Sequence, residues 1–281
     1  MLRPKSKRAT RCLKTYGAAY SHRVRVAVVI PVYNEARWVR EAVRRLLASR
    51  GDRPAADVFV VDDGSSDGSR AIIEALANES GITPLFHERN RGKGAAIRTG
   101  IAAAVAACVD VVLIHDADLE YDPMDHSAVL APIFDGRADA VIGSRFTGQT
   151  HRVLYYWHSV ANGFITTLCN MATNLNLTDV ECCTKAFTRP VLLQMKLKEE
   201  RFGIEIELVA KVAKVCLPNA ERSALASTHT STPASTPTSR RARVYEVAIS
   251  YSGRTYDEGK KISWKDGLAA VWCIGKYGPF G

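Results

Sequence analysis

Short apolar stretches alternate with longer amphipathic segments over the first half of the chain. The apolar stretches are rich in valine and isoleucine and predict strands at 24–32, 57–62, 83–87, 109–115 and 138–143. The amphipathic segments between them predict helices that end near Ser49, Ala77, Cys108 and Phe134. Strands that alternate with helices in this way predict an α/β fold with a doubly wound, mainly parallel sheet flanked by helices.

The second half has a less regular pattern. It predicts helices at 153–172, 201–214 and 264–276 and a strand at 244–251. The helix at 153–172 carries tyrosine and tryptophan near its start, and these side chains favour the headgroup level of a membrane. Two interpretations of this helix therefore stay open: it packs on the sheet, or it lies at a membrane surface.

Two segments differ in composition from the rest. Residues 1–23 contain no acidic residue and are expected to be a disordered basic tail, with a membrane-surface anchor or an organellar transit peptide as alternatives. Residues 217–243 are dominated by Ser, Thr, Ala, Pro and Arg and are expected to be a disordered insertion, either a surface loop or an artefact of gene modelling. The remainder of 24–276 is predicted to be one domain, followed by a short tail at 277–281.

Net charge and cysteine content limit the partners, metal sites and cellular compartment that are expected for this chain. A net charge of +9 over 281 residues favours anionic partners, but no nucleic-acid recognition motif is present, so nucleic acid is not expected. The seven cysteines lack the spacing of a metal site and fit reduced thiols. No apolar run approaches the ~20 residues that span a bilayer. A cytoplasmic protein, peripheral on the cytosolic face of a membrane, is expected.

Polar residues follow several of the predicted strands. In parallel α/β sheets, ligands bind beyond the carboxyl ends of the strands, so these residues are expected to converge on one crevice. They are Tyr33, Asn34, Glu35, Asp62, Asp63, the loop 89–94, Asp116, Asp118, Ser144 and Arg145.

Asp116 and Asp118 come directly after the predicted strand 109–115. Side chains two residues apart in an extended chain point the same way, and paired carboxylates suit Mg²⁺ or Mn²⁺ shared with substrate phosphates. Glu120 lies two residues after Asp118, so in an extended chain its side chain would point the same way. It is predicted to be a third oxygen ligand, direct or through water. An isolated Asp-x-Asp more often marks solvated acids at a strand end, but the convergence of the other polar residues favours the metal.

Lys93 lies in the glycine-bearing loop 90–94, which is neither a Walker A loop nor a complete Gly-x-Gly-x-x-Gly. A crevice that holds acids for a metal and bases for phosphates suits a nucleoside diphosphate. Asp62 and Asp63 either bind ribose hydroxyls or a base edge, or form an Asx turn before Gly64.

These motifs occur in the order and spacing of family 2 glycosyltransferases, which the chain resembles from about residue 24 to 276 apart from the insertion. The motifs are Pro31–Glu35, Val61–Asp67, Asn90–Gly94 and Asp116–Glu120. The later stretches Gly143–Arg145, Leu177–Lys185, Arg201–Glu205 and Arg254–Lys261 resemble the polyprenyl-phosphate branch, of which dolichyl-phosphate mannose synthase is typical.

The resemblance implies a GT-A fold, a GDP- or UDP-sugar donor, a polyprenyl-phosphate acceptor and a divalent metal. It assigns the nucleotide to Pro31, Tyr33, Glu35, Asp62, Asp63 and Lys93, the metal to Asp116, Asp118 and Glu120, and the acceptor phosphate to Ser144, Arg145 and Lys260. Arg254 would stabilise the leaving diphosphate, so Asp116, Asp118 and Arg254 are the expected catalytic residues. Asp179, Glu181 and Lys185 also match a motif of the family, but no role is assigned to these three residues.

A lipid monophosphate has a second pKa near ~6 and is largely ionised at neutral pH, so it attacks the sugar without a general base. Direct displacement with inversion is therefore expected. Two alternatives stay open. A sugar or small-alcohol acceptor would need a carboxylate base, for which Glu181 and Glu205 are available. A catalytically silent subunit would bind the nucleotide-sugar alone.

Overall fold

The computed structural model describes residues 24–49, 56–148, 152–153, 155–219, 239–255 and 264–278. The predicted basic tail at 1–23, the middle of the predicted insertion, and Lys260 lie outside the described residues.

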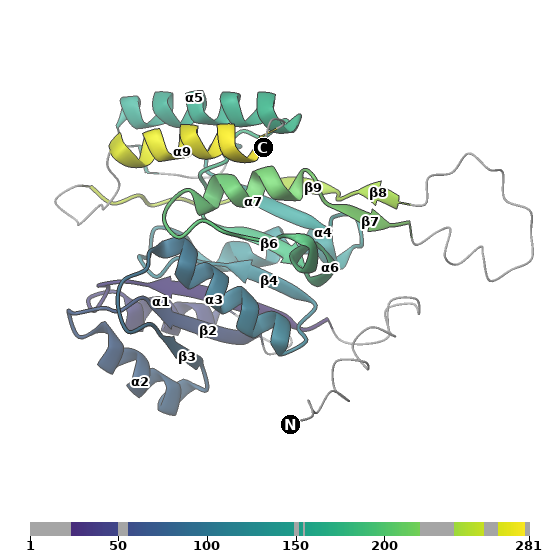
Figure 1. Ribbon diagram of the computed structural model, residues 1–281. Helices are drawn as coiled ribbons and strands as arrows, with labels where there is room; N and C mark the ends of the chain where they lie inside the picture. The colour runs from purple at the N-terminus through teal and green to yellow at the C-terminus, as the bar shows by residue number, and fades with distance from the viewer. Residues whose placement is uncertain are drawn as a thin grey trace, which may run out of the picture.

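A seven-stranded sheet lies at the centre of the described structure (Figure 1). Its strands are β1 (Val26–Val32), β2 (Asp57–Asp62), β3 (Thr83–Phe86), β4 (Val111–Ile114), β5 (Ala140–Ser144), β6 (Lys185–Thr188) and β9 (Val244–Ala248). Their spatial order is β3-β2-β1-β4-β6-β5-β9. Strand β6 runs antiparallel to both of its neighbours, and the other pairs in this sheet are parallel. The predicted α/β fold with a mainly parallel sheet is confirmed.

Helices cover both faces of the sheet (Figure 1). They are α1 (Val39–Ala48), α2 (Ser69–Ser80), α3 (Lys93–Ala106), η2 (Pro123–Asp125), α4 (His126–Phe134), α5 (Tyr156–Thr173), α6 (Arg189–Gln194), α7 (Ile204–Val212) and α9 (Trp264–Tyr277). Val28 and Ile30 of β1 pack with α1, α2 and α4, whereas Ala27 and Val29 pack with α3. A strand buried on both faces needs apolar residues at every position, which explains the continuous apolar runs.

Helices α5 and α9 lie side by side in Figure 1 and pack against α7. The predicted helix 153–172 is therefore ordered as α5 and contacts the body of the protein along one side. None of the helices in the described ranges is both long enough and apolar enough to cross a membrane.

The sequence patterns missed strand β6 and the short helix α6. Strand β6 has four residues and begins with a lysine, so it lacks the apolar run that marked the other strands. Its neighbours supply the reason for its conformation, because it completes the hydrogen bonding between β4 and β5.

The expectation of disorder over 217–243 is wrong at both ends of that segment. Strand β7 (Cys216–Pro218) pairs antiparallel with β8 (Ser239–Arg241), and strand β9 follows directly. Arg240 lies 2.5 Å from the carboxylate of Asp139, which also pairs with Arg243 at 3.1 Å. These contacts join residues about a hundred positions apart, so local composition could not reveal them. Residues 220–238 lie outside the described part of the chain.

Candidate active site

The carboxyl ends of β1, β2 and β4 meet at one edge of the sheet, because these strands are parallel neighbours. Strand β6 is antiparallel, so its beginning lies at this same edge. Lys185, the first residue of β6, stands opposite Ile114, the last residue of β4. The antiparallel strand thus brings the 182–185 segment beside Asp116, which follows β4.

Lys93, the first residue of α3, is the centre of a buried group of charges. Its Nζ lies 2.8 Å from Asp116 Oδ2 and 3.4 Å from Glu205 Oε1, and it donates a hydrogen bond of 2.8 Å to Cys183 Sγ. Burial opposes the charge on Lys93, but Asp116 raises the pKa of the amine well above its ordinary value. Burial likewise opposes the charge on Asp116, and Lys93 lowers the pKa of that carboxyl. Both groups are therefore ionised at neutral pH.

Lys185 extends this group of charges. Its Nζ lies 2.5 Å from Glu205 Oε2 and also donates to the carbonyl of Cys182. The side chain of Lys185 is fully buried, so its charge depends on Glu205 for compensation. The resulting row runs Asp116, Lys93, Glu205, Lys185. Sequence reasoning placed Lys185 and Glu205 in motifs, but twenty residues separate them and no local pattern marks an ion pair at that distance.

Arg254, which follows β9, joins three carboxylates. Its guanidinium lies 3.1 Å from Asp118 Oδ2, 3.2 Å from Glu120 Oε1 and 3.5 Å from Glu35 Oε2. The hydroxyl of Tyr251 donates to the other oxygen of Glu120 at 2.9 Å. The structure therefore brings together predicted residues from the ends of β1, β4 and β9.

Asp116 and Asp118 fit a divalent cation. Asp116 Oδ1 is buried and has no hydrogen-bond partner among the described residues. Burial, together with the nearby charges of Asp116 and Glu120, raises the pKa of Asp118 to about 7. A cation between the two carboxylates would compensate their charge and occupy the unpartnered oxygen.

Glu120, the predicted third ligand, is engaged by residues on the β9 side of the site. Both of its oxygens accept hydrogen bonds, from Arg254 and from Tyr251. An extended chain would direct Glu120 to the same side as Asp118, but strand β4 ends at Ile114 and Leu119 has a left-handed backbone with φ of 62°. This turn directs Glu120 toward the β9 side. Within the described ranges, no three His, Cys, Asp or Glu residues are arranged to hold a metal by themselves.

Asp63 holds the loop that leads into α3. It accepts hydrogen bonds from the backbone N–H groups of Arg91 (3.0 Å) and Gly92 (2.7 Å), and it lies 2.6 Å from His87 Nδ1. Gly64, with φ of +70°, lets this loop pass closely, because a Cβ there would lie 2.4 Å from the carbonyl carbon of Arg89. The loop that carries Lys93 is thus positioned from the end of β2.

Asp62 adopts the turn contact that was one of its two expected roles. Its Oδ1 accepts from the backbone N–H of Ser65 at 3.3 Å, and its Oδ2 lies 3.4 Å from Arg70 Nε.

The loop after β1 is tied to the loop after β2. The backbone N–H groups of Asn34, Glu35 and Ala36 donate to the side chains of Ser65, Ser69 and Asp67, each at 2.9 Å. Pro31 is buried within β1, Glu35 is nearly buried, and Tyr33 is about 39% exposed. The two loops are thereby joined, and Glu35 on the first of them lies beside Arg254.

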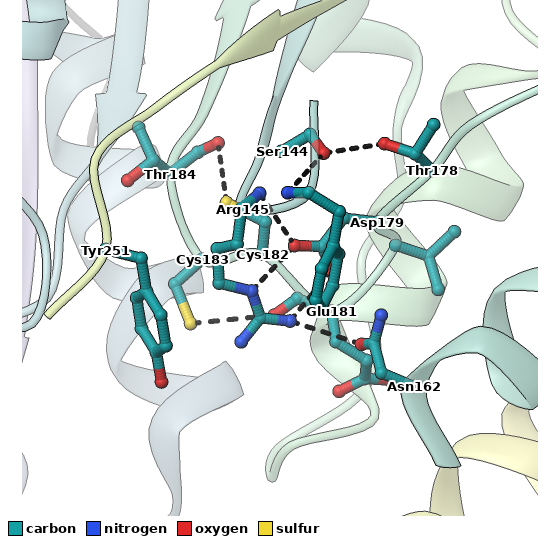
Figure 2. Close-up of polar contacts among 12 residues, drawn as sticks. Ser144, Arg145, Asn162, Thr178, Asp179, Glu181, Cys182, Cys183, Thr184 and Tyr251 are labelled. Atoms are coloured by element: carbon teal, nitrogen blue, oxygen red, sulfur yellow. Dashed lines mark hydrogen bonds and ion pairs between the residues drawn. The ribbon is translucent and has the colours of Figure 1, made fainter. Parts of the chain in front are cut away.

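Asp179 engages Arg145, one of the residues predicted to bind the acceptor phosphate (Figure 2). Its Nε and a terminal nitrogen lie 2.6 Å and 2.8 Å from the two oxygens of Asp179, and the guanidinium also donates to Asn162 Oδ1 at 3.2 Å. Burial opposes the charge on Arg145, but the negative charge of Asp179 outweighs this effect and raises the pKa of the guanidinium well above its ordinary value. Beside it, Ser144 Oγ lies 2.6 Å from the hydroxyl of Thr178. Asp179, which had no assigned role, therefore orients Arg145.

Glu181, on the same loop as Asp179, has an unusual carboxyl group. Its Oε1 is buried and has no hydrogen-bond partner among the described residues. Burial, reinforced by Glu205, raises its pKa to about 7. Glu181 is therefore divided between its protonated and ionised forms at neutral pH.

We expect Glu181→Gln to change how stability depends on pH. A folded-state pKa of about 7, raised from 4.5, gives stability that is present below pH 4.5 and is lost as the pH rises through 7. Glutamine cannot ionise, so the free energy of unfolding of the variant, relative to that of the natural chain, should increase by about 1–3 kcal/mol between pH 5 and pH 8. Urea unfolding at several pH values measures this. A difference that is constant with pH would show that Glu181 does not titrate in this range.

Comparisons with known proteins agree with this fold. The family model described as "Glycosyl transferase family 2" matches residues 27–195. Glycosyltransferase AglJ of Haloferax volcanii is 31% identical over 189 residues, which are 67% of this chain and 58% of that protein. An undecaprenyl-phosphate 4-deoxy-4-formamido-L-arabinose transferase of Proteus mirabilis is 29% identical over 180 residues, 63% of this chain and 53% of that protein. The chain thus spans little more than half the length of these two relatives.

A UDP-N-acetylglucosamine–dolichyl-phosphate N-acetylglucosaminyltransferase of Methanococcus voltae is 26% identical over 208 residues, 68% of this chain and 81% of that protein. Among solved structures, glucosyl-3-phosphoglycerate synthase of Mycobacterium tuberculosis, in complex with Mn²⁺, UDP and glucosyl-3-phosphoglycerate, superposes with a TM-score of 0.58. It is 17% identical, and the match covers 92% of this chain and 81% of that one. This likeness establishes a GT-A-like fold.

Proposed function

Because the chain belongs to glycosyl transferase family 2, we propose that it transfers a sugar from a GDP- or UDP-sugar to a polyprenyl or dolichyl phosphate. The observation that carries the proposal is the convergence of Lys93, Asp116, Asp118 and Arg254 at the carboxyl edge of the sheet. Two of the relatives are named as transferases to undecaprenyl or dolichyl phosphate, which supports the choice of acceptor.

In this proposal, Asp116 and Asp118 hold Mg²⁺ or Mn²⁺ together with the donor diphosphate. The metal, when bound, neutralises charge that develops on the leaving nucleoside diphosphate. The structural neighbour that binds Mn²⁺ with UDP supports this choice. Pro31, Tyr33, Glu35 and Asp63 line the nucleoside side, with Asp62 behind them. Lys93 keeps Asp116 ionised and oriented.

Arg254 is proposed to move from its carboxylate partners toward the diphosphate when the donor binds. A guanidinium is always charged and recognises phosphate oxygens in a bidentate manner. Asp118 and Glu35 hold it beside the residues that are proposed to bind the metal and the nucleotide. Lys260, which lies outside the described residues, stays in the proposal as a second cation for phosphate.

On the acceptor side, Ser144 and Arg145 are proposed to receive the lipid phosphate. The phosphate attacks the anomeric carbon directly, and the sugar is inverted, because an ionised monophosphate needs orientation and charge compensation rather than deprotonation. Asp179 fixes the guanidinium of Arg145 so that one face stays near the ring of Tyr251, 5.2 Å away. Tyr251 also contacts Glu120, so this tyrosine links the proposed acceptor residue Arg145 to the carboxylates that hold Arg254.

A second candidate function is transfer to a sugar or small alcohol. It is favoured by Glu181, whose pKa of about 7 suits a general base at neutral pH. A third is a catalytically silent subunit that binds the nucleotide-sugar alone. For all three candidates we expect the protein to act in the cytoplasm, in agreement with the free thiols of the described cysteines.

The proposal is tested by incubating the full chain with GDP- and UDP-sugars and either a short polyprenyl phosphate in detergent or soluble sugar acceptors. We expect a lipid-phosphate product from one nucleotide class, lost with EDTA and restored by Mn²⁺. Thermal shifts with each nucleotide, with and without Mn²⁺, identify the donor independently. Transfer to soluble acceptors alone would overturn the acceptor, and donor binding without any transfer would support the silent subunit.

A further inference from the structure

Glu246, in the middle of the edge strand β9, belongs to none of the sequence motifs, yet its carboxylate contacts the loop beside the proposed acceptor residues. Its Oε1 accepts hydrogen bonds from the backbone N–H groups of Thr178 at 2.7 Å and Asp179 at 3.2 Å. Its Oε2 accepts from the hydroxyl of Thr178 at 3.0 Å. One carboxylate thus holds two consecutive residues that lie nearly seventy positions earlier in the chain.

The loop that Glu246 holds connects α5 to β6 and has no regular secondary structure. The backbone polar groups of such a loop need partners from other parts of the protein. Asn170 of α5 accepts from the backbone N–H of Leu177 at 3.1 Å and donates to its carbonyl at 2.7 Å. Glu246 accepts from the next two N–H groups. The position of Thr178 and Asp179 therefore depends on side chains of α5 and β9.

The two residues held by Glu246 contact Ser144 and Arg145 directly (Figure 2). Thr178 Oγ1 lies 2.6 Å from Ser144 Oγ. Both oxygens of Asp179 contact the guanidinium of Arg145, and the carboxylate also accepts from the backbone N–H of Arg145 at 3.1 Å. Two consecutive loop residues therefore fix the two consecutive residues that are proposed to receive the acceptor phosphate.

The register of the sheet places Glu246 on the same face as Ser144. Glu246 stands opposite Ile142 in the parallel pair of β9 with β5, and Ser144 follows Ile142 by two residues. Side chains of paired residues, and of residues two apart in a strand, point to the same face of a sheet. Glu246 and Ser144 therefore approach Thr178 from one face, and the hydroxyl of Thr178 contacts both of them.

We propose that Glu246 is a positioning residue of the acceptor site: it holds Thr178 and Asp179 so that Ser144 and Arg145 keep their orientation toward the acceptor phosphate. This inference rests on the proposed function, which assigns the acceptor to these two residues. A guanidinium recognises phosphate oxygens through its planar geometry, so its orientation determines how well it binds them. The contacts of Glu246 reach the acceptor residues and none of the proposed metal ligands. Its loss should therefore weaken acceptor binding and leave donor binding unchanged.

Initial rates of the full chain with a short polyprenyl phosphate in detergent test this role. Glu246→Ala should raise the KM for the lipid phosphate by about tenfold or more, because three hydrogen bonds to the loop are lost. The KM for the nucleotide-sugar should stay close to that of the natural chain. Glu246→Gln keeps an oxygen for the two backbone N–H groups and should restore most of the acceptor affinity.

The matched control is Asp139→Asn, which alters ion pairs with Arg240 and Arg243 just before β9 and does not touch the loop. It should leave the KM for the lipid phosphate unchanged, and circular dichroism confirms that each variant is folded. An equal rise of this KM in Asp139→Asn would show that a general loosening of β9, and not the contact made by Glu246, disturbs the acceptor site. An unchanged KM in Glu246→Ala would also overturn the proposal.

A second measurement does not need sugar transfer. The Nε–H of Arg145, which donates to Asp179 at 2.6 Å, gives a nitrogen-15 NMR signal that Arg145→Lys identifies by its loss. In Glu246→Ala this proton should exchange faster with solvent than in the natural chain, and Glu246→Gln should restore the slow exchange. An unchanged exchange rate in Glu246→Ala would overturn the positioning role. A changed rate in a chain that transfers no sugar would remove the proposed function and leave the positioning of Arg145 by Glu246 in place.

Discussion

Asp116→Asn should lower sugar transfer by on the order of 1,000-fold while the protein remains folded. Asp116 has one oxygen on Lys93 and one buried oxygen without a partner. Asparagine keeps the shape but removes the charge that would hold the cation and compensate Lys93. Initial rates at saturating donor and Mn²⁺ measure the loss, and the thermal shift produced by nucleotide with Mn²⁺ should disappear in parallel.

The matched control is Asp110→Asn, at the opposite end of the same strand. Asp110 accepts a hydrogen bond from the backbone of Arg25 and lies away from the carboxyl edge. Its replacement should leave both the rate and the metal-dependent shift close to those of the natural chain. If Asp116→Asn also kept near-natural turnover, the assignment of Asp116 to the metal would be wrong.

Glu205→Gln should destabilise the protein by about 3–5 kcal/mol, because it leaves the buried ammonium of Lys185 without a carboxylate. Lys185 is fully buried, and its remaining partner is a backbone carbonyl. Lys93 loses its contact with Glu205 as well but keeps Asp116. The midpoint of urea unfolding measures the effect, which should be among the largest for any isosteric substitution in this chain.

Two controls make this prediction specific. Glu41→Gln removes a carboxylate from exposed ion pairs with Arg44 and Arg45 and should leave the midpoint of urea unfolding close to that of the natural chain. Lys185→Met/Glu205→Leu removes both buried charges and should recover much of the stability that the single variant loses. A single variant as stable as the natural chain would mean that water or another group compensates Lys185.

The sequence predicted the elements that are apolar on their own. Local runs of valine, isoleucine and alanine supply the buried residues of strands β1, β2 and β4 and of the helices between them. The expected convergence of Glu35 and Asp118 also follows from local information, since it needs only the strand ends and the parallel topology, whereas Arg254, which joins them, was expected from the family resemblance.

The parts that the sequence did not predict depend on contacts between distant residues. Strand β6 is defined by the strands on either side of it, and Arg145 by Asp179, thirty-four positions away. The role of Glu120 required the turn at Leu119, which no sequence pattern marked. Such features arise when separate elements pack together, so a linear pattern of apolar and polar residues carries little information about them.

Because β7 pairs with β8, the number of residues between these two strands does not determine the geometry of the site. Pro218 and Ser239 are partners in this pair, so the chain leaves the body of the protein and returns to it at one point. Closing a loop costs only ~0.6 kcal/mol more for each doubling of its length. The pair therefore marks a position where segments of different length can be exchanged between related proteins, or a tag inserted, without shifting β9 and Arg254.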